Sequence, residues 1–210
     1  MPRQNRVTPY GELEAVAGRG TFWGNRGQLL NASGGLARYS QGKLWIICVL
    51  EFKGRRRTLW QPNRLTELFF LDEATGLAAG HRPCGECRYP RYQAFKRAWE
   101  AVFPGEPSGA QAMNERLHAD RLTSPGVRRT YQAPLDELPD GAMADIDGRP
   151  WLVLGDRLLA WSHSGYQEQR DRPGGERVTV ITPRATVAVL AAGYQPALHH
   201  STGRNNHDVP

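Results

Sequence analysis

The residues with the clearest capacity for chemistry are two cysteines, Cys84 and Cys87, in the segment His-Arg-Pro-Cys-Gly-Glu-Cys at residues 81–87. A C-x-x-C spacing lets two thiolates bind one metal ion, and zinc commonly takes such a pair. A redox role would need a strand-to-helix context that Gly80 and Pro83 do not favour. The pair therefore predicts either a structural zinc site or two reduced structural thiols. Spacing does not choose the remaining zinc ligands among Cys48, His81, His118, His199 and His200.

Three other residues are candidates for catalysis. Glu67 lies within an apolar segment (residues 65–71), where a desolvated carboxylate could act as a general acid or base. Asn25 lies in a glycine-rich segment (residues 18–27) that could line a pocket. His118 shares helical spacing with Asn114 and Arg121 and could act as a base or contact a phosphate. The structural alternatives are an exposed helix position for Glu67, a plain turn for Asn25 and a surface stripe for His118.

A basic turn flanked by aromatic residues spans residues 52–60. Its cations could pair with phosphates while an aromatic ring stacks on a base or wedges into a duplex. The alternative is a solvated turn with core aromatic residues behind it. The predicted nucleic-acid contacts are Lys53, Arg55, Arg56, Arg57 and Trp60 in this turn, with Arg82 and Arg88 on the same face.

The overall composition agrees with a nucleic-acid-binding protein. The 210 residues carry a net charge of +6, and only three of the 27 basic residues are lysines. Arginine suits phosphate and base contacts, although a GC-rich genome would also enrich it. The low cysteine count argues against a disulfide scaffold, and no apolar run is long enough to cross a bilayer. With no charged-then-apolar leader, we expect a cytoplasmic monomer that binds double-stranded DNA and no membrane.

The periodicity of the sequence predicts an α+β fold, with a helical middle segment packed between β-rich N- and C-terminal parts. We expect one domain over residues 1–200 and a disordered tail at residues 201–210. Expected strands cover residues 7–16, 43–52, 58–60, 143–146, 151–154, 157–161 and 178–182. Expected helices cover residues 64–79 (broken near Asp72), 91–103, 108–122 and 183–193, and residues 18–27 are expected to form a loop.

Residues 73–87, Glu-Ala-Thr-Gly-Leu-Ala-Ala-Gly-His-Arg-Pro-Cys-Gly-Glu-Cys, resemble the second half of the Ada-type zinc domain, which repairs methylated DNA phosphates. The resemblance covers residues 65–88, and Phe69-Phe70 fits the family's aromatic strand. It implies an Ada-like segment at residues 43–103 that faces DNA. The positions corresponding to the family's first cysteine pair hold Lys53 and Arg57, so the methyl-accepting thiol is missing and methyl transfer is not expected.

Base excision fits the remaining residues best. The chain also resembles, more loosely, small bacterial DNA glycosylases that act on modified bases in phage defence. We therefore expect a monofunctional DNA glycosylase in which Glu67 or Asn25 handles water, His118 assists and no cofactor is required for catalysis. A non-catalytic, zinc-containing DNA-binding module and a nuclease that uses His118 are the alternatives.

Overall fold

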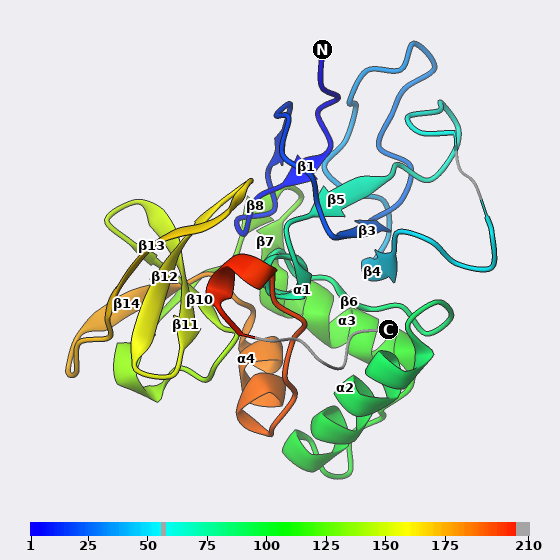
Figure 1. Cartoon of the computed structure of the whole chain (residues 1–210). Coiled ribbons are helices and arrows are strands. Elements are labelled where there is room, and N and C mark those ends of the chain that lie inside the picture. The colour runs from blue at the N-terminus through cyan, green and yellow to red at the C-terminus, as the bar shows by residue number, and fades with distance from the viewer. Residues whose placement is uncertain (56–57, 205–210) are drawn as a thin grey trace.

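A computed structural model, which describes residues 1–55 and 58–204, shows a mixed α+β fold. Two six-stranded sheets lie on either side of helix α1, and the longer helices gather along one side of the molecule (Figure 1). The helices are α1 (Glu73–Ala78), α2 (Tyr89–Val102), α3 (Ala110–Arg121) and α4 (Arg184–Ala191), with 3-10 turns at Leu135–Glu137 and His200–Thr202. The predicted helical middle between two β-rich parts is confirmed.

The N-terminal sheet has the strand order β2-β1-β5-β3-β4-β6. The β1–β5 and β4–β6 pairs are parallel, and the remaining neighbours are antiparallel. Its strands are short, so strands from distant parts of the first 83 residues must assemble to form it. Their bounds are β1 (Arg6–Val7), β2 (Leu13–Glu14), β3 (Phe22–Asn25), β4 (Ile46–Val49), β5 (Leu68–Phe70) and β6 (Arg82–Pro83).

The C-terminal sheet is antiparallel, with the strand order β13-β12-β11-β10-β14-β9. Asp147-Gly148 forms the β10–β11 turn, and both residues have positive φ, which such a tight turn requires. The strands are β9 (Tyr131–Pro134), β10 (Met143–Ile146), β11 (Arg149–Leu154), β12 (Arg157–Ser162), β13 (Gly165–Asp171) and β14 (Arg177–Val180), and a separate hairpin joins β7 (Leu122–Ser124) to β8 (Val127–Arg128). The four strands predicted here are confirmed as β10, β11, β12 and β14.

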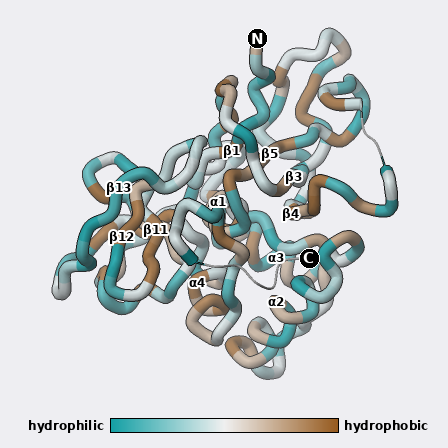
Figure 2. Tube along the Cα trace, in the orientation of Figure 1, coloured by the Kyte–Doolittle hydropathy of each residue, from teal (hydrophilic) through white to brown (hydrophobic). Residues whose placement is uncertain are grey.

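One hydrophobic cluster joins both sheets to the helices. It includes Phe70 from β5, Leu77 from α1, Trp99 from α2, Val153 from β11 and Val189 from α4. Hydrophobic stretches run through β5 and β11 (Figure 2). Because this core crosses from one sheet to the other, the two β-rich parts pack as one unit.

Four expectations about the N-terminal half were wrong. Residues 7–16 do not form one strand, because β1 and β2 pair there as an antiparallel hairpin. The segment at residues 18–27 contains strand β3, in which Gly24 lets the Ile46 carbonyl approach closely: an added Cβ would lie 2.0 Å from that oxygen. Residues 68–70 form strand β5, because a short apolar run can be a buried strand as readily as a helix. Residues 58–60 form no strand, because β3 and β6 occupy the two edges of β4.

The predicted disordered tail does not begin at residue 201. Ser201 accepts a hydrogen bond from the Tyr166 backbone N–H at 2.8 Å, and Thr202 is buried. These contacts hold the His200–Thr202 turn against β13. Residues 205–210 lie outside the described residues.

Candidate metal centre and adjoining cleft

One face of the N-terminal sheet brings together most of the residues that could bind a ligand or take part in catalysis. Trp23 in β3 lies opposite Cys48 in β4 and opposite Phe69 in β5. Side chains two residues apart on a strand share a face, so Asn25 joins Trp23 there. Continuing the β3–β5 register by one residue places Glu67 across from Asn25.

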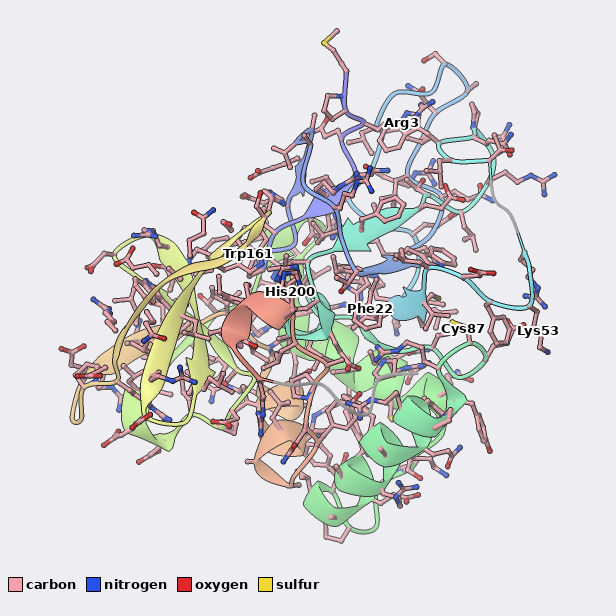
Figure 3. The ribbon with its side chains drawn as sticks, viewed as in Figure 1. Arg3, Phe22, Lys53, Cys87, Trp161 and His200 are labelled. Atoms are coloured by element: carbon pink, nitrogen blue, oxygen red, sulfur yellow. The ribbon has the colours of Figure 1, made fainter. Side chains whose placement is uncertain are left out.

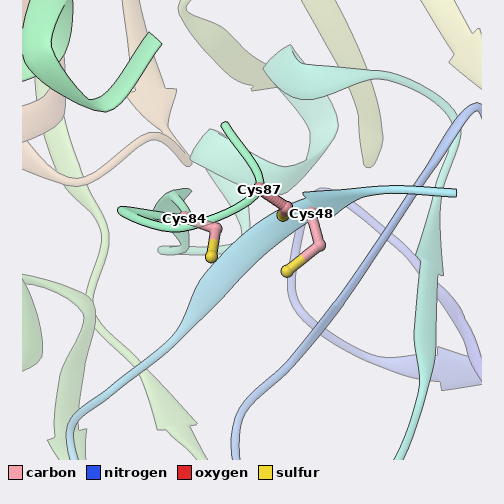
Figure 4. A group of neighbouring side chains, drawn as sticks. All are labelled: Cys48, Cys84 and Cys87. Atoms are coloured by element: carbon pink, nitrogen blue, oxygen red, sulfur yellow. The ribbon is translucent and has the colours of Figure 1, made fainter. Parts of the chain in front are cut away.

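The three cysteines of the chain form a cluster at the edge of this face. Cys48 comes from β4, whereas Cys84 and Cys87 follow β6, which runs parallel to β4. The backbone N–H of Cys84 donates to the Ile47 carbonyl at 2.9 Å and fixes the turn beside β4. All three sulfur atoms lie within 4.8 Å of one another (Figure 4).

The cluster could hold a metal ion such as zinc. A tetrahedral site with Zn–S bonds of about 2.3 Å needs sulfur atoms about 3.8 Å apart, which small side-chain movements would achieve from this arrangement. Of the residues considered as further ligands, Cys48 is the one that the fold brings to Cys84 and Cys87. His81 instead packs against the rings of Trp45 and Phe70.

Hydrogen bonding within the cluster favours a thiolate at Cys84. Hydrogen bonds with the Cys48 and Cys87 thiols, and with the Glu86 backbone N–H, lower the pKa of Cys84 well below its usual value. Hydrogen bonding to Cys84 raises the pKa of Cys48. Because the thiolate is the form that binds metals, Cys84 is the best prepared of the three ligands.

Two adjacent cavities lie on the same sheet face. A cleft of about 590 Å³ is lined by Trp23, Leu50, Glu51, Gly54, Arg55, Leu59, Glu67 and Phe69. A smaller cavity of about 140 Å³ adjoins the three cysteines and is also lined by Asn25, Phe52 and Glu86. Trp23, Leu50 and Arg55 line both, so the metal centre lies beside the larger cleft.

Glu67 is 6% exposed and borders the larger cleft. Its carboxylate accepts a hydrogen bond from the Trp60 backbone N–H at 3.2 Å. The Asn5 side chain donates to the Glu67 carbonyl and holds the backbone in place. The structure thus brings the predicted residues Glu67 and Asn25 to one face, and the alternative of an exposed helix position for Glu67 is wrong.

The predicted nucleic-acid contacts divide into two groups. Arg55 lines the larger cleft, and Lys53 lies on the same loop. Figure 3 shows Lys53 to the right of Cys87, at the outer side of the molecule. Arg55 forms an exposed ion pair with Glu86 at 2.9 Å. The Trp60 indole donates to the Gly34 carbonyl at 2.9 Å, which fixes its ring. The predicted contacts Arg56 and Arg57 lie outside the described residues.

Arg82 and Arg88 are buried, so the prediction that they contact nucleic acid is wrong. Arg82 donates to the Asn114 side chain at 2.8 Å, and Arg88 donates to the carboxylate of Glu73 at 2.8 Å. Their position next to the cysteine motif suggested an exposed basic face, but both charges are used inside the fold.

His118 lies in a different part of the molecule from Glu67. It lines a separate cleft of about 440 Å³ together with Lys43. Partial burial and the charges of Arg121 and Lys43 lower the pKa of His118. Arg121 is itself buried, so the expected surface stripe on α3 is wrong. The prediction that His118 assists Glu67 is not supported by this placement.

Sequence reasoning missed a pair of buried carboxylates, Asp72 and Glu73. Asp72 caps α1 by accepting from the Thr75 N–H at 2.9 Å, and it also accepts from the Tyr166 hydroxyl at 2.9 Å. Glu73 binds Arg88 and Tyr194. Both acids therefore tie α1 to the C-terminal part, and only their adjacency at a helix start could have drawn attention to them.

No protein-family model, curated protein or solved structure matches this chain. Among the described residues, none of the helices is both long and apolar enough to cross a membrane.

Proposed function

We propose that this protein is a DNA glycosylase that hydrolyses the N-glycosidic bond of a modified base. The observation that carries this proposal is the position of Glu67, a nearly buried carboxylate at the border of an open cleft of about 590 Å³. Clefts of this size accommodate small organic ligands, and a nucleobase extruded from a duplex is one of them.

The cleft also supplies groups that recognise a base. Trp23 and Phe69 lie opposite each other on β3 and β5 and offer aromatic surface for stacking. Asn25 offers an amide that can donate to and accept from a base edge or a water molecule. Lys53 and Arg55 at the rim would contact backbone phosphates.

In the proposed reaction, water attacks the anomeric carbon of the sugar. The C–O bond forms as the C–N bond breaks, and the bonding electrons leave with the base, which takes a proton from solvent. Glu67 accepts the proton from the attacking water and stabilises the oxocarbenium-like transition state. The products are a free base and an abasic site.

The cysteine cluster adds a structural part to this proposal. Zinc held by Cys48, Cys84 and Cys87 would fasten the turn after β6 to β4, which forms part of the cleft face. The same cluster favours the second candidate function, a zinc-containing DNA-binding module without catalysis. No group of carboxylates around His118 in the described residues favours a nuclease.

The test uses duplex DNA with normal or phage-type modified bases, followed by alkali. Release of free base with alkali-labile sites supports the glycosylase. Glu67→Gln is expected to lower the rate by about 10²–10⁴-fold and to leave DNA binding intact. Glu51→Gln is the matched control, because Glu51 lines the same cleft but is exposed.

Other outcomes contradict the proposal. Intact DNA with a salt-dependent gel shift would favour the binding module. Metal-dependent strand breaks without base release would favour a nuclease. Full base release by Glu67→Gln would remove Glu67 from the mechanism.

A further inference from the structure

We propose that the three-cysteine site binds its metal ion with one coordination position open to the adjoining cavity, where it accepts a small donor ligand from solution. This inference does not depend on the proposed glycosylase activity. It concerns the number of ligands that the chain can supply and the space in front of them.

The chain cannot supply a fourth thiolate. It contains three cysteines in all, and each is already in the cluster. Within residues 1–55 and 58–204, no histidine or acidic ligand atom joins the three sulfur atoms within the 4.8 Å that they span. Zinc sites bind four ligands, so a metal held here needs one more donor.

His81 is the nearest histidine along the sequence, and the fold removes it from the site. Its ring is fully buried, with its centroid 5.1 Å from Trp45 and 4.8 Å from Phe70. Glu86 borders the small cavity, but its carboxylate pairs with Arg55 at 2.9 Å. Neither residue is placed as the fourth ligand.

The cavity beside the sulfur atoms has room for an external ligand. Its volume of about 140 Å³ exceeds the roughly 30 Å³ that one water molecule occupies in the liquid. It is lined by all three cysteines and shares three wall residues with the larger cleft. The cavity therefore has room for a donor directly beside the three sulfur atoms.

Asn25 also lines the small cavity and is only 4% exposed. Its side-chain amide can donate a hydrogen bond to, or accept one from, a ligand that occupies this cavity.

The ligand set indicates the kind of metal and donor. Three thiolates favour zinc or another thiophilic ion. With a divalent ion, three thiolates leave a net charge of −1, so a neutral donor such as water or an imidazole is better suited to the open position than an anion. Three protein ligands and one exchangeable ligand are typical of reactive zinc sites, whereas closed structural sites use four protein ligands.

Cobalt(II) can test the open position in the full-length protein, reduced with a phosphine so that no thiol competes. We expect one cobalt per chain and a tetrahedral visible spectrum with thiolate charge-transfer bands. Added imidazole should shift the ligand-field bands saturably without releasing cobalt. X-ray absorption of the zinc form should show three sulfur donors and one lighter donor.

Two variants sharpen the test. Cys48→Ser should remove about a third of the charge-transfer intensity and weaken zinc binding by at least about tenfold, because a ligand is lost. His81→Phe is the control and should leave the cobalt spectrum unchanged. Loss of the lighter donor in His81→Phe would identify His81 as the fourth ligand and overturn the proposal.

The wild-type protein alone can also refute the proposal. Failure to bind cobalt or zinc, a site with two sulfur donors, or a four-coordinate spectrum that imidazole does not change would each do so. None of these readouts involves DNA, so a negative result in the base-release assay leaves them unaffected.

Discussion

Replacing Glu73 by alanine probes the buried ion pair that joins α1 to α2 and to the C-terminal segment. The Glu73 side chain is 0% exposed and that of Arg88 is 2% exposed. The carboxylate accepts hydrogen bonds from Arg88 at 2.8 Å, the Tyr194 hydroxyl at 2.5 Å and the Ala197 N–H at 2.8 Å. The variant would leave these three donors without their acceptor.

The expected cost in unfolding free energy is about 3–5 kcal/mol, the usual range when one partner of a buried ion pair is removed. Glu168→Ala is the matched control, because Glu168 and Arg149 form an ion pair at 3.0 Å with both side chains 54% exposed. Exposed pairs contribute at most about 1 kcal/mol. The two variants should therefore differ by about 2–5 kcal/mol at pH 7.

The effect should depend on pH in a defined direction. Burial by itself would raise the pKa of Glu73, but Arg88 and Arg91 outweigh it and hold the pKa below its usual value. The carboxylate therefore stabilises the fold above the unfolded-state pKa of about 4.3, and this contribution disappears as the pH falls through the lower folded-state pKa. The gap between wild type and Glu73→Gln should narrow below about pH 4.

Urea unfolding of each variant, followed by circular dichroism, measures each free energy of unfolding. Equal losses of unfolding free energy for Glu73→Ala and Glu168→Ala at pH 7 would refute the reasoning, because burial would then have no effect on how much an ion pair contributes to stability. A wild-type advantage over Glu73→Gln that grows on acidification would refute the pKa argument.

Two further variants test other parts of the fold. Burial, with the charges of Arg26 and Arg121, lowers the pKa of His81 well below its usual value. Below about pH 6.5 the unfolded chain gains a proton at His81 that the folded chain does not, so the free energy of unfolding falls by up to about 1.4 kcal/mol per pH unit. His81→Phe should remove this contribution. If urea unfolding between pH 7 and 5 gives the same dependence on pH for the variant as for the wild type, the argument is contradicted. Gly24→Ala should lower the free energy of unfolding by about 1–3 kcal/mol, because the added Cβ would lie 2.0 Å from the Ile46 carbonyl oxygen. Gly174→Ala is the control: its Cβ would face open space, so its thermal denaturation should match that of the wild type.

Local patterns predicted the parts of the fold that depend on local interactions. The helix at residues 91–103 and the strands around the Asp147-Gly148 turn follow from side-chain periodicity and turn chemistry, and α2 and the β10–β11 hairpin confirm them. Leu68–Phe70 could not be assigned in this way. A three-residue apolar run carries no period, and its neighbours β1 and β3 come from the first 25 residues of the chain.

The candidate site shows the same division. The C-x-x-C spacing by itself identified Cys84 and Cys87 as a pair of thiols that could bind a metal, and the apolar surroundings of Glu67 marked it as a desolvated carboxylate. Only the tertiary structure decided that Cys48 completes the cluster, because parallel pairing of β4 with β6 brings together residues 36 positions apart. It also decided that Arg82 and Arg88 lie inside the fold. A sequence gives the charge of a side chain, but it does not show the buried hydrogen-bond partner that offsets the cost of removing that charge from water.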